Sequence, residues 1–260
     1  MKKAASFALG CKVNQYESEA IAELFAEKGY EIVGIDEEAD VYVINTCTVT
    51  NFGDKKSRQL IRKVKRQNEN AIVAVVGCYA QTAPKELMEI AGVNLVIGTK
   101  DRAQIVEMVE QYDRANGVEN HVSDIMKERV FEPLSIQKLA NRTRAYLKIQ
   151  DGCSQYCSYC IIPYARGPIR SREPQEVVAE VKRLAENGFK EVVLTGIHVA
   201  SYGKDRRDTS LLDILKQVHE VEGIERIRFS SIEPNVVTEE FAQTMAALPK
   251  VCDHFHLSLQ

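Results

Sequence analysis

The residues with the most distinctive chemistry in this sequence are its seven cysteines, three of which stand close together. Cys153, Cys157 and Cys160 lie in the segment QDGCSQYCSYCIIPYARG with the spacing CxxxCxxC. Three thiolates this close can ligate three irons of a cubane cluster and leave the fourth iron open. A closed zinc site is the alternative, but it needs four ligands, and Cys252 is far along the chain. The spacing therefore favours an iron–sulfur cluster with an open position.

A second set of cysteines is spread over the first part of the chain. Cys11, Cys47 and Cys78 each follow a predicted strand directly, in FALGC, VINTC and VVGC. Because the carboxyl ends of parallel strands gather along one edge of a sheet, these distant thiols can converge there. Three separate buried thiols are the alternative. Because all three cysteines fall at the same edge, a second iron–sulfur cluster with three protein ligands explains them better.

The residues around the second set predict alternating strands and helices. Expected strands cover residues 4–9, 41–45, 71–76 and 95–97. Expected helices cover residues 14–28 and 52–67, the segment from Thr82 to about Gly92, and the segment from Asp101 to about Tyr112. Asn14 and Glu17 have the spacing of an N-cap and a capping box for the first of these helices. The alternation predicts an α/β fold with a doubly wound parallel sheet in residues 1–115.

A second alternating series follows a polar stretch without clear periodicity at residues 116–140, which we interpret as a linker. Strands are expected at residues 146–149, 191–194, 226–230 and 255–259, and helices at 174–187, 211–221 and 239–248. This order predicts an incomplete parallel (β/α) barrel in residues 141–260. Because Gln260 falls inside or just after a strand, we expect the sequence to be part of a longer protein.

Composition restricts the class of protein. The 260 residues contain 34 Lys and Arg against 37 Asp and Glu, with a net charge of −3 and 45% hydrophobic residues. These are ordinary values for a soluble globular protein. No apolar run approaches the ~20 residues of a membrane span. An odd number of cysteines fits poorly with a disulfide framework, so we expect reduced thiols and a cytoplasmic location.

Any binding of nucleic acid must depend on local basic patches, since the net charge is slightly negative. One patch lies in the basic helix after Cys47, where the candidate phosphate contacts are Lys55, Lys56, Arg58 and Arg62. A solvated helix face is the alternative. The other patch follows the cysteine triplet and consists of Arg166, Arg170 and Arg172. Arginines there can hold a carboxylate or phosphate bidentately.

The motif CxxxCxYC after the first strand of a parallel barrel resembles the radical S-adenosylmethionine superfamily. The resemblance implies that Cys153, Cys157 and Cys160 ligate a 4Fe–4S cluster whose open iron binds S-adenosylmethionine. Reductive cleavage of that cofactor yields a 5′-deoxyadenosyl radical. The resemblance also implies that five residues contact the cofactor: Tyr159, Thr195, Gly196, Ser231 and Glu233. For the last four, the alternative is that they are ordinary loop residues at strand ends.

The whole chain resembles the methylthiotransferase family, through LGCKVNQYESE, VINTCTVTNFGDKKSRQ, VVGCYAQ, IQDGCSQYCSYCIIPYARGPIRSR and FHLSLQ. This family inserts a methylthio group at an unactivated C–H bond. The resemblance implies a second 4Fe–4S cluster on Cys11, Cys47 and Cys78. NTCTVTNFGDKKSRQ and PYARGPIRSR look most like the branch that modifies C2 of N6-threonylcarbamoyladenosine next to the anticodon of tRNA.

The implied partners are tRNA and an electron donor such as a flavodoxin-type reductant. The carboxylate of the threonylcarbamoyl group makes Arg166, Arg170 and Arg172 candidates for reading the substrate. Three alternatives stay open: isopentenyl-adenosine in tRNA, an aspartate of a ribosomal protein, and a non-catalytic metal-containing RNA-binding module. Members of the family continue past this point, with the rest of the barrel and a small C-terminal β-domain.

Overall fold

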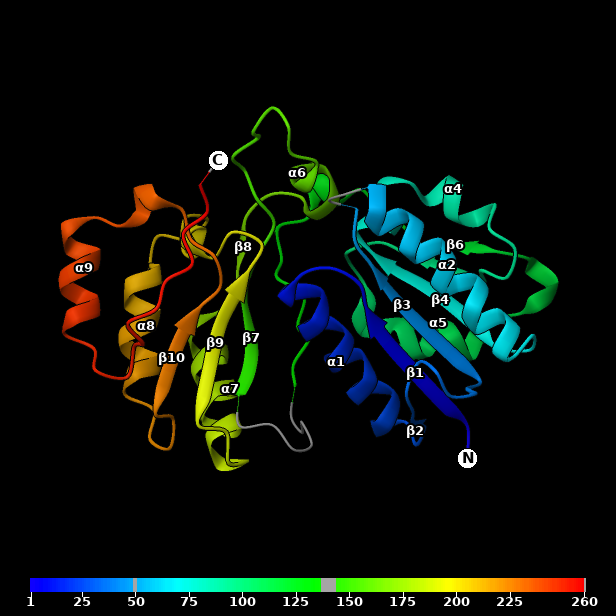
Figure 1. Ribbon diagram of the computed structural model, residues 1–260, viewed down its shortest axis with the longest axis horizontal. Helices are drawn as coiled ribbons and strands as arrows, with labels where there is room; N and C mark the ends of the chain where they lie inside the picture. Colours follow the sequence, from blue (N-terminus) through cyan, green and yellow to red (C-terminus); the bar gives the residue numbers. More distant parts are fainter. Residues whose placement is uncertain (49–50, 137–143, 260) are drawn as a thin grey trace. The chain divides into compact units, whose positions relative to one another are not determined.

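A computed structural model describes residues 1–48, 51–136 and 144–259 (Figure 1). Contacts divide the chain into two compact units, which are described separately. The first contains Met1–Glu128, Glu132–Leu134 and Gln155–Gly167. The second contains Arg129–Phe131, Ser135–Ser154 and Pro168–Gln260. The segment Gln155–Gly167, which carries two of the clustered cysteines, therefore packs with the first unit although the second surrounds it in the sequence.

The first unit is built on a parallel sheet whose strands pair in the order β2-β1-β3-β4-β5-β6 (Figure 1). These strands are β1 (Lys3–Ala8), β2 (Glu31–Ile32), β3 (Val41–Thr46), β4 (Ile72–Gly77), β5 (Leu95–Ile97) and β6 (Glu119–Asn120). The chain goes from β1 to one side and then returns to β3 on the other, so its winding reverses between β1 and β3. Ligands bind at such reversal points, outside the carboxyl ends of the strands.

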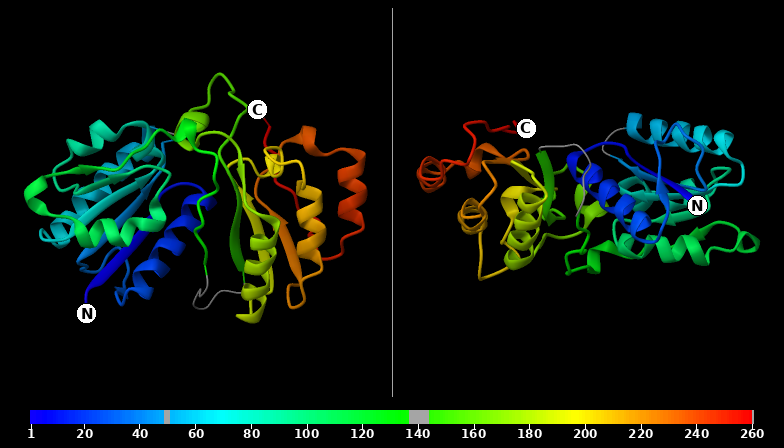
Figure 2. Two further views of the ribbon diagram at one scale, coloured as in Figure 1. Left: turned by 180° about the vertical axis from the view of Figure 1, so that it is seen from behind. Right: turned by 90° about the horizontal axis from the view of Figure 1, so that it is seen from below.

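Helices cover both faces of this sheet, as Figure 2 shows. The helices of this unit are α1 (Lys12–Glu27), α2 (Asn51–Gln67), α3 (Cys78–Thr82), α4 (Pro84–Met88), α5 (Ile105–Gln111) and α6 (Ile162–Arg166). Phe25 of α1 shares a buried cluster with Val43 of β3, whereas Ile61 of α2 shares another with the next strand residue, Ile44. Since successive strand residues point to opposite faces, the two clusters lie on the two sides of the sheet. The predicted doubly wound α/β fold is confirmed.

The second unit has a smaller sheet with the order β10-β9-β7-β8. Its strands are β7 (Arg144–Asp151), β8 (Arg170–Ser171), β9 (Glu191–Gly196) and β10 (Arg226–Phe229), and only β8 runs antiparallel to its neighbour. The helices α7 (Pro174–Glu186), α8 (Leu211–His219) and α9 (Glu239–Ala246) alternate with the parallel strands. This is the expected partial (β/α) barrel.

Short 3₁₀ turns complete the described elements: η1 (Arg102–Gln104), η2 (Arg114–Asn116), η3 (Ile125–Lys127), η4 (Val199–Ser201) and η5 (Pro234–Val236). Within the described ranges, no helix combines the length and apolarity needed to cross a membrane.

Three helix starts differ from the sequence expectation. The helix α1 begins at Lys12 with Cys11 at its N-cap position, and no side chain caps it. Asn14 is instead completely buried and turned toward the sheet, which removes it from the capping role. Asp101 has a left-handed backbone (φ +63°) and makes no capping hydrogen bond, and Thr82 ends α3 rather than capping the helix after it.

The strand expected at residues 255–259 is also absent from the described residues as a regular element. Its backbone makes an isolated parallel bridge through Leu257 to Ile232, with Ile232 N–H donating to His256 at 3.0 Å. Because β10 already ends at Phe229, no longer ladder forms. The stretch expected as a linker, residues 116–140, contains β6, which pairs in parallel with β5 and extends the first sheet.

An ion cluster holds the amino end of the second sheet. Glu191, the first residue of β9, accepts hydrogen bonds from Nε of Arg226 at 3.0 Å and of Arg228 at 2.9 Å, and pairs with Arg144 at 2.6 Å. Burial by itself would raise the pKa of Glu191. The hydrogen bond from Arg226 and the charges of Arg144 and Arg228 outweigh that effect, so the pKa lies below its ordinary 4.5.

Candidate functional site

Three cysteines follow three neighbouring strands at the carboxyl edge of the first sheet. Cys11 comes shortly after β1, Cys47 directly after β3, and Cys78 directly after β4. These strands are adjacent, in the order β1-β3-β4, and the reversal of winding lies between the first two. The three cysteines are 36 and 31 residues apart in sequence, and the order of the strands places all three at this edge of the sheet.

Close approach of the backbone depends on glycine at two positions. A Cβ atom on Gly10 would lie 2.6 Å from Cβ and 2.8 Å from Sγ of Cys47, so the loop before Cys11 contacts the second cysteine. A Cβ on Gly77 would lie 2.3 Å from Oδ1 of Asn45. Both glycines also have positive φ, +103° and +95°, which other residues rarely adopt. The geometry of this edge therefore requires glycine at both positions, each directly before a cysteine.

A buried arginine joins the thiols from the segment that follows the cysteine triplet. Arg166, at the end of α6, is completely buried. Its Nε donates to Sγ of Cys78 at 3.1 Å, and its Nη2 donates to Oδ1 of Asn14 at 2.6 Å. The same Asn14 oxygen accepts from the Cys11 thiol at 3.5 Å. Arg166 and Asn14 thus connect Cys11 with Cys78.

Glu17 supplies the negative charge that Arg166 needs in this buried place. Its Oε1 accepts from Nη1 of Arg166 at 2.6 Å, and its Oε2 lies 2.6 Å from Nη1 of Arg102. Arg102 in turn pairs with Glu132 at 2.5 Å. Glu17, Arg166 and Arg102 are all completely buried. Buried charges persist only when they are paired and hydrogen-bonded, and this chain of alternating charges meets that condition.

The electrostatics of Cys78 reflect these neighbours. Burial raises the pKa of the Cys78 thiol, and the charge of Arg166 together with its hydrogen bond opposes the rise. The charges of Cys11 and Glu17 raise the pKa further, so that it ends above its ordinary 9.0. An arginine that donates to a cysteine sulfur favours the negatively charged form, which is the form that binds metal.

The donor set fits an iron–sulfur cluster in its chemistry. Three thiols share one edge, one of them accepts a hydrogen bond from a buried cation, and Gly10 keeps a side chain out of the space beside Cys47. Hydrogen bonds to cluster sulfurs are one means by which proteins tune such groups. Among the described residues, no three Cys, His, Asp or Glu side chains are drawn together tightly enough to hold a single metal ion.

The triplet of clustered cysteines is divided between the two units. Cys153 follows β7 in the second unit and is buried. Cys157 and Cys160 belong to the segment packed with the first unit, where Cys157 is exposed and Cys160 half-buried. A turn connects these two, with Cys160 N–H donating to the Cys157 carbonyl at 2.9 Å. Tyr159 between them is 68% exposed.

The expected cofactor contacts lie at the carboxyl ends of the second sheet's strands. Thr195 and Gly196 end β9, and Ser231 and Glu233 follow β10. The Thr195 side chain is fully buried, and its Oγ1 has no hydrogen-bond partner among the described residues. An unsatisfied buried hydroxyl is unfavourable unless a ligand or water completes it.

Two histidines that the sequence analysis did not single out contact two of these positions. Ser231 Oγ lies 2.6 Å from Nδ1 of His256, and Glu233 Oε1 lies 3.0 Å from Nε2 of His198. The backbone N–H of His198 also donates to Oε1 of Gln150 at 2.8 Å, next to the loop that leads to Cys153. The sequence carried no signal for these pairs, because histidine and partner are about 25 to 35 residues apart.

Three arginines expected to read the substrate have internal partners instead. Arg166 is committed to Glu17, as described above. Arg170 lies 3.6 Å from Oδ2 of Asp151, and Arg172 pairs with Glu180 at 2.5 Å. All three are at least 96% buried. Their contacts favour structural and positioning roles rather than the carboxylate contact expected from the sequence, because each charge already has a carboxylate partner.

The four residues of the basic helix that the sequence analysis singled out as phosphate contacts divide into two groups. Arg58 donates from Nη1 to the Tyr79 hydroxyl at 2.7 Å and lies over the Tyr79 ring at 5.9 Å, which makes it part of the packing. Lys55, Lys56 and Arg62 are exposed on α2. These three are therefore accessible to phosphate groups.

Two protein-family models match separate parts of the chain. Residues 3–98 match the family described as "Uncharacterized protein family UPF0004", and residues 147–260 match the radical SAM superfamily. The fold resembles that of the radical S-adenosylmethionine methyltransferase TsrM from Kitasatospora setae, with a TM-score of 0.61 at 17% identity over 95% of this chain and 58% of that chain. The second part of the chain is thus a radical S-adenosylmethionine domain.

The curated relatives identify one family within the radical S-adenosylmethionine superfamily. The chain is 49% identical over its whole length to the threonylcarbamoyladenosine tRNA methylthiotransferase MtaB of Bacillus subtilis, of which it covers 58%. It is 41% identical to MtaB of Aquifex aeolicus over 99% of this chain and 63% of that one. It is 35% identical to the tRNA-2-methylthio-N(6)-dimethylallyladenosine synthase of Dictyoglomus thermophilum over 96% of this chain and 58% of that one. The chain belongs to the radical S-adenosylmethionine methylthiotransferase family, and it spans less than two thirds of the length of these relatives.

Proposed function

We propose that this chain is the part of a tRNA methylthiotransferase that carries out insertion of a methylthio group at C2 of N6-threonylcarbamoyladenosine next to the anticodon. The relative of 49% identity bears the name of that activity. The observation that carries the proposal is the gathering of Cys11, Cys47 and Cys78 at the reversal point of the first sheet, with Arg166 donating to one sulfur. A thiol-rich edge of this kind suits a sulfur-transferring enzyme better than a plain RNA-binding module.

Two 4Fe–4S clusters and S-adenosylmethionine are the cofactors that we infer. When bound, they would supply the one-electron chemistry that replaces a C–H bond by a C–S bond. Cys11, Cys47 and Cys78 would hold one cluster, and the triplet at residues 153, 157 and 160 would hold the other. Each set offers three thiolates, so each leaves one iron without a protein ligand.

The chain's own residues would position these groups and exclude water. Arg166 holds the sulfur of Cys78 and the amide of Asn14, and Glu17 keeps the arginine charged and fixed. Because Arg166, Asn14 and Glu17 are completely buried, this side of the thiol edge is dry. A fixed hydrogen bond in a dry site is stronger than the same bond in water.

The strand ends of the second unit would bind S-adenosylmethionine. Tyr159 has an exposed ring that can stack on adenine. The unpaired hydroxyl of buried Thr195 can accept or donate one hydrogen bond to the cofactor, beside Gly196. His256 and His198 orient Ser231 and Glu233, which would then contact polar groups of the same ligand.

The partners that we infer are tRNA and an electron donor such as a flavodoxin-type reductant. Exposed Lys55, Lys56 and Arg62 would contact the phosphates of tRNA. A cytoplasmic location follows from tRNA as the substrate and from thiolates as cluster ligands.

Analysis of tRNA nucleosides tests the substrate directly. A strain that lacks the gene should lose the 2-methylthio derivative of threonylcarbamoyladenosine and retain its unmodified precursor, measured by mass spectrometry. The isopentenyl derivative should be unchanged. Loss of the isopentenyl derivative instead would move the chain to the other branch, which the 35% identity to the Dictyoglomus enzyme makes the second candidate. An unchanged nucleoside profile would refute both.

Iron analysis of the anaerobically reconstituted chain tests the two clusters. We expect about eight irons and eight sulfides per chain. Replacing Cys11, Cys47 and Cys78 together by serine should halve the count, and so should the same change at residues 153, 157 and 160. The matched control is Cys252→Ser, which changes the only cysteine outside both sets and should leave the iron content unaltered. A wild-type count of four would refute the second cluster.

A further inference from the structure

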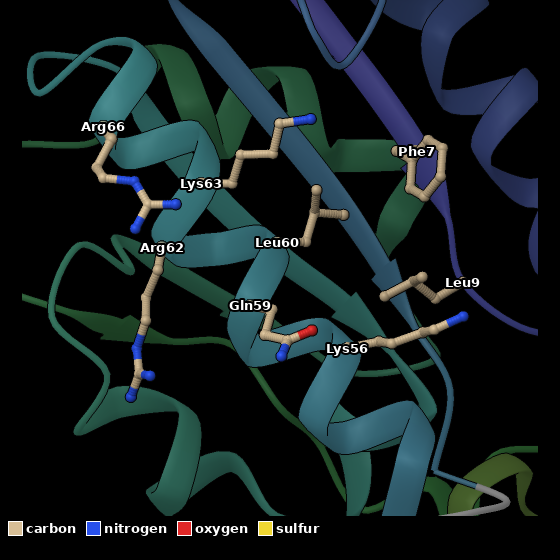
Figure 3. Close-up of a pocket in the computed structure, with 8 residues that line it drawn as sticks. All are labelled: Phe7, Leu9, Lys56, Gln59, Leu60, Arg62, Lys63 and Arg66. Atoms are coloured by element: carbon tan, nitrogen blue, oxygen red, sulfur yellow. The ribbon is translucent and has the colours of Figure 1, made fainter.

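A groove beside the thiol edge offers both an apolar surface and a row of cations. It lies between β1 and α2 in the first unit, has a volume of about 570 Å³, and is drawn in Figure 3. Its lining consists of Phe7, Leu9, Lys56, Gln59, Leu60, Arg62, Lys63 and Arg66. Phe7 comes from β1, Leu9 follows that strand directly, and the other six residues come from the basic helix.

The apolar part of the groove is exposed because of how α2 packs. Ile61 and Val64 of α2 are completely buried in the cluster that contains Ile44 of β3. The helix therefore lies over β3 and β4, and the end of β1 beside them stays uncovered on this face. Phe7 is consequently 37% exposed and its ring stands at one side of the groove, across from Leu60 (Figure 3).

The basic part of the groove is a regular stripe along α2. Lys56, Gln59, Lys63 and Arg66 follow one another at spacings of three, four and three residues, which keeps them on one side of a helix. All four are exposed. Lys63 also pairs with Asp36, which is not among the lining residues. The lining residues include four cations, Lys56, Arg62, Lys63 and Arg66, and no carboxylate.

The position of the groove ties it to the thiol edge. Leu9 is two residues before Cys11, and its N–H donates to the Asn45 carbonyl at 2.8 Å, two residues before Cys47. The helix α2 begins at Asn51, four residues after Cys47. The groove therefore starts where the cysteines gather and runs away from them along the helix.

We propose that this groove binds an unpaired stretch of RNA, with one base against Phe7 and Leu60 and the phosphates along Lys56, Lys63 and Arg66. An aromatic ring beside a track of cations is the usual means of binding single-stranded nucleic acid. A duplex would meet only the cations, because its bases are stacked inside. The inference rests on the proposed function, in which tRNA is the partner, and it names the surface that holds a splayed nucleotide of that RNA.

Binding of the full chain to an unstructured single-stranded RNA of about eight nucleotides, measured by fluorescence anisotropy, tests the groove. Phe7→Leu keeps an apolar side chain but removes the ring, and we expect it to weaken this binding by about tenfold without changing the salt dependence. Lys56→Gln with Arg66→Gln removes two phosphate contacts. This pair should weaken binding and lower the slope of log K against log salt by about 1.4.

Two matched controls separate the groove from charge in general. Lys28→Gln with Lys85→Gln removes the same charge from exposed positions of the first unit outside the groove and should change the slope much less. A duplex RNA of the same length should bind Phe7→Leu as well as it binds the unchanged chain. The proposal is overturned if Phe7→Leu binds single strands normally, or if the control pair matches the groove pair. An acidic peptide that displaces the RNA while Phe7→Leu has no effect would assign the groove to a protein partner instead.

Failure of the groove and failure of the proposed function are distinguishable. The nucleoside profile of the deletion strain does not depend on the groove variants, whereas the anisotropy measurement needs neither clusters nor turnover. If the groove variants bind RNA normally and the deletion strain has an altered nucleoside profile, only the groove proposal is refuted. An unchanged profile with groove-dependent RNA binding would remove only the methylthiotransferase proposal.

Discussion

Glu17→Gln is expected to be among the most destabilising conservative changes in the first unit. Glu17 accepts from Arg166 at 2.6 Å and lies 2.6 Å from Arg102, and the side chains of all three are fully buried. Glutamine keeps the shape of the side chain and removes its charge. Arg102 retains Glu132, whereas Arg166 loses the carboxylate that it contacts at 2.6 Å.

The magnitude follows from one buried cation that has lost its counter-charge. Removing one partner of a buried ion pair costs about 3–5 kcal/mol, because the remaining charge stays desolvated. This corresponds to roughly two to four powers of ten in the equilibrium constant for unfolding. Glu27→Gln on the exposed end of the same helix is the matched control and should change the free energy of unfolding by about 0.5 kcal/mol or less.

Urea unfolding of the reduced, metal-free chain, followed by circular dichroism, measures both variants. Arg166→Met gives the third corner of a double-mutant cycle with Glu17→Gln. If the ion pair is as tightly coupled as its geometry indicates, the double variant should be less destabilised than the sum of the single variants by at least about 1 kcal/mol. A loss below about 1 kcal/mol for Glu17→Gln, or additive effects in the cycle, would refute the buried charge chain.

Three further predictions concern single positions. Gly77→Ala should lower the midpoint of thermal unfolding far more than Gly29→Ala, because both glycines have positive φ but only the first would meet a neighbour closer than 2.5 Å; equal losses would contradict the close approach. Lys148→Met should destabilise the chain by about 2–3 kcal/mol in urea, since it removes the nearer of two cations from the Asp151 carboxylate, which is 1% exposed, at 2.6 Å against 3.6 Å for Arg170. A neutral effect would show that pair to be dispensable. The pKa of Glu191 is lowered in the folded state, so its stabilisation is present above pH 4.5 and is lost as the pH falls through the folded-state pKa. Glu191→Gln should therefore be less stable than the unchanged chain at pH 7, and the difference should shrink in acid. Parallel stability curves across that pH range would contradict the shift.

The fold was accessible from the sequence because its signals are local and repeated. Continuous apolar strands such as 71–76 and glycine or proline at the helix ends fix the alternation of the two elements. The order of the strands was not accessible in the same way. That β2 lies outside β1, and that the winding reverses before β3, depends on packing between segments far apart in the chain.

Individual roles were harder to predict than elements. Asn14 and Glu17 have capping spacing, yet the structure turns both inward, because a buried arginine 149 residues beyond Glu17 needs partners. Likewise Arg166 and Arg172 look like ligand contacts in sequence, where their exposure is invisible. The sequence shows which groups a charged residue is able to bind. Only the folded structure shows whether an ion pair inside the chain already involves that charge.

The packing of Gln155–Gly167 with the first unit has a consequence for how this protein could be dissected or rearranged. A gene split at the stretch between the two halves would give an amino-terminal product without α6, in which Glu17 keeps Arg102 but loses Arg166. A chimera that takes its amino-terminal half from a distant homologue would also need that homologue's equivalent of the thirteen residues Gln155–Gly167. The amino-terminal half of the sequence is therefore not a complete structural unit without this segment, even though each unit has its own sheet.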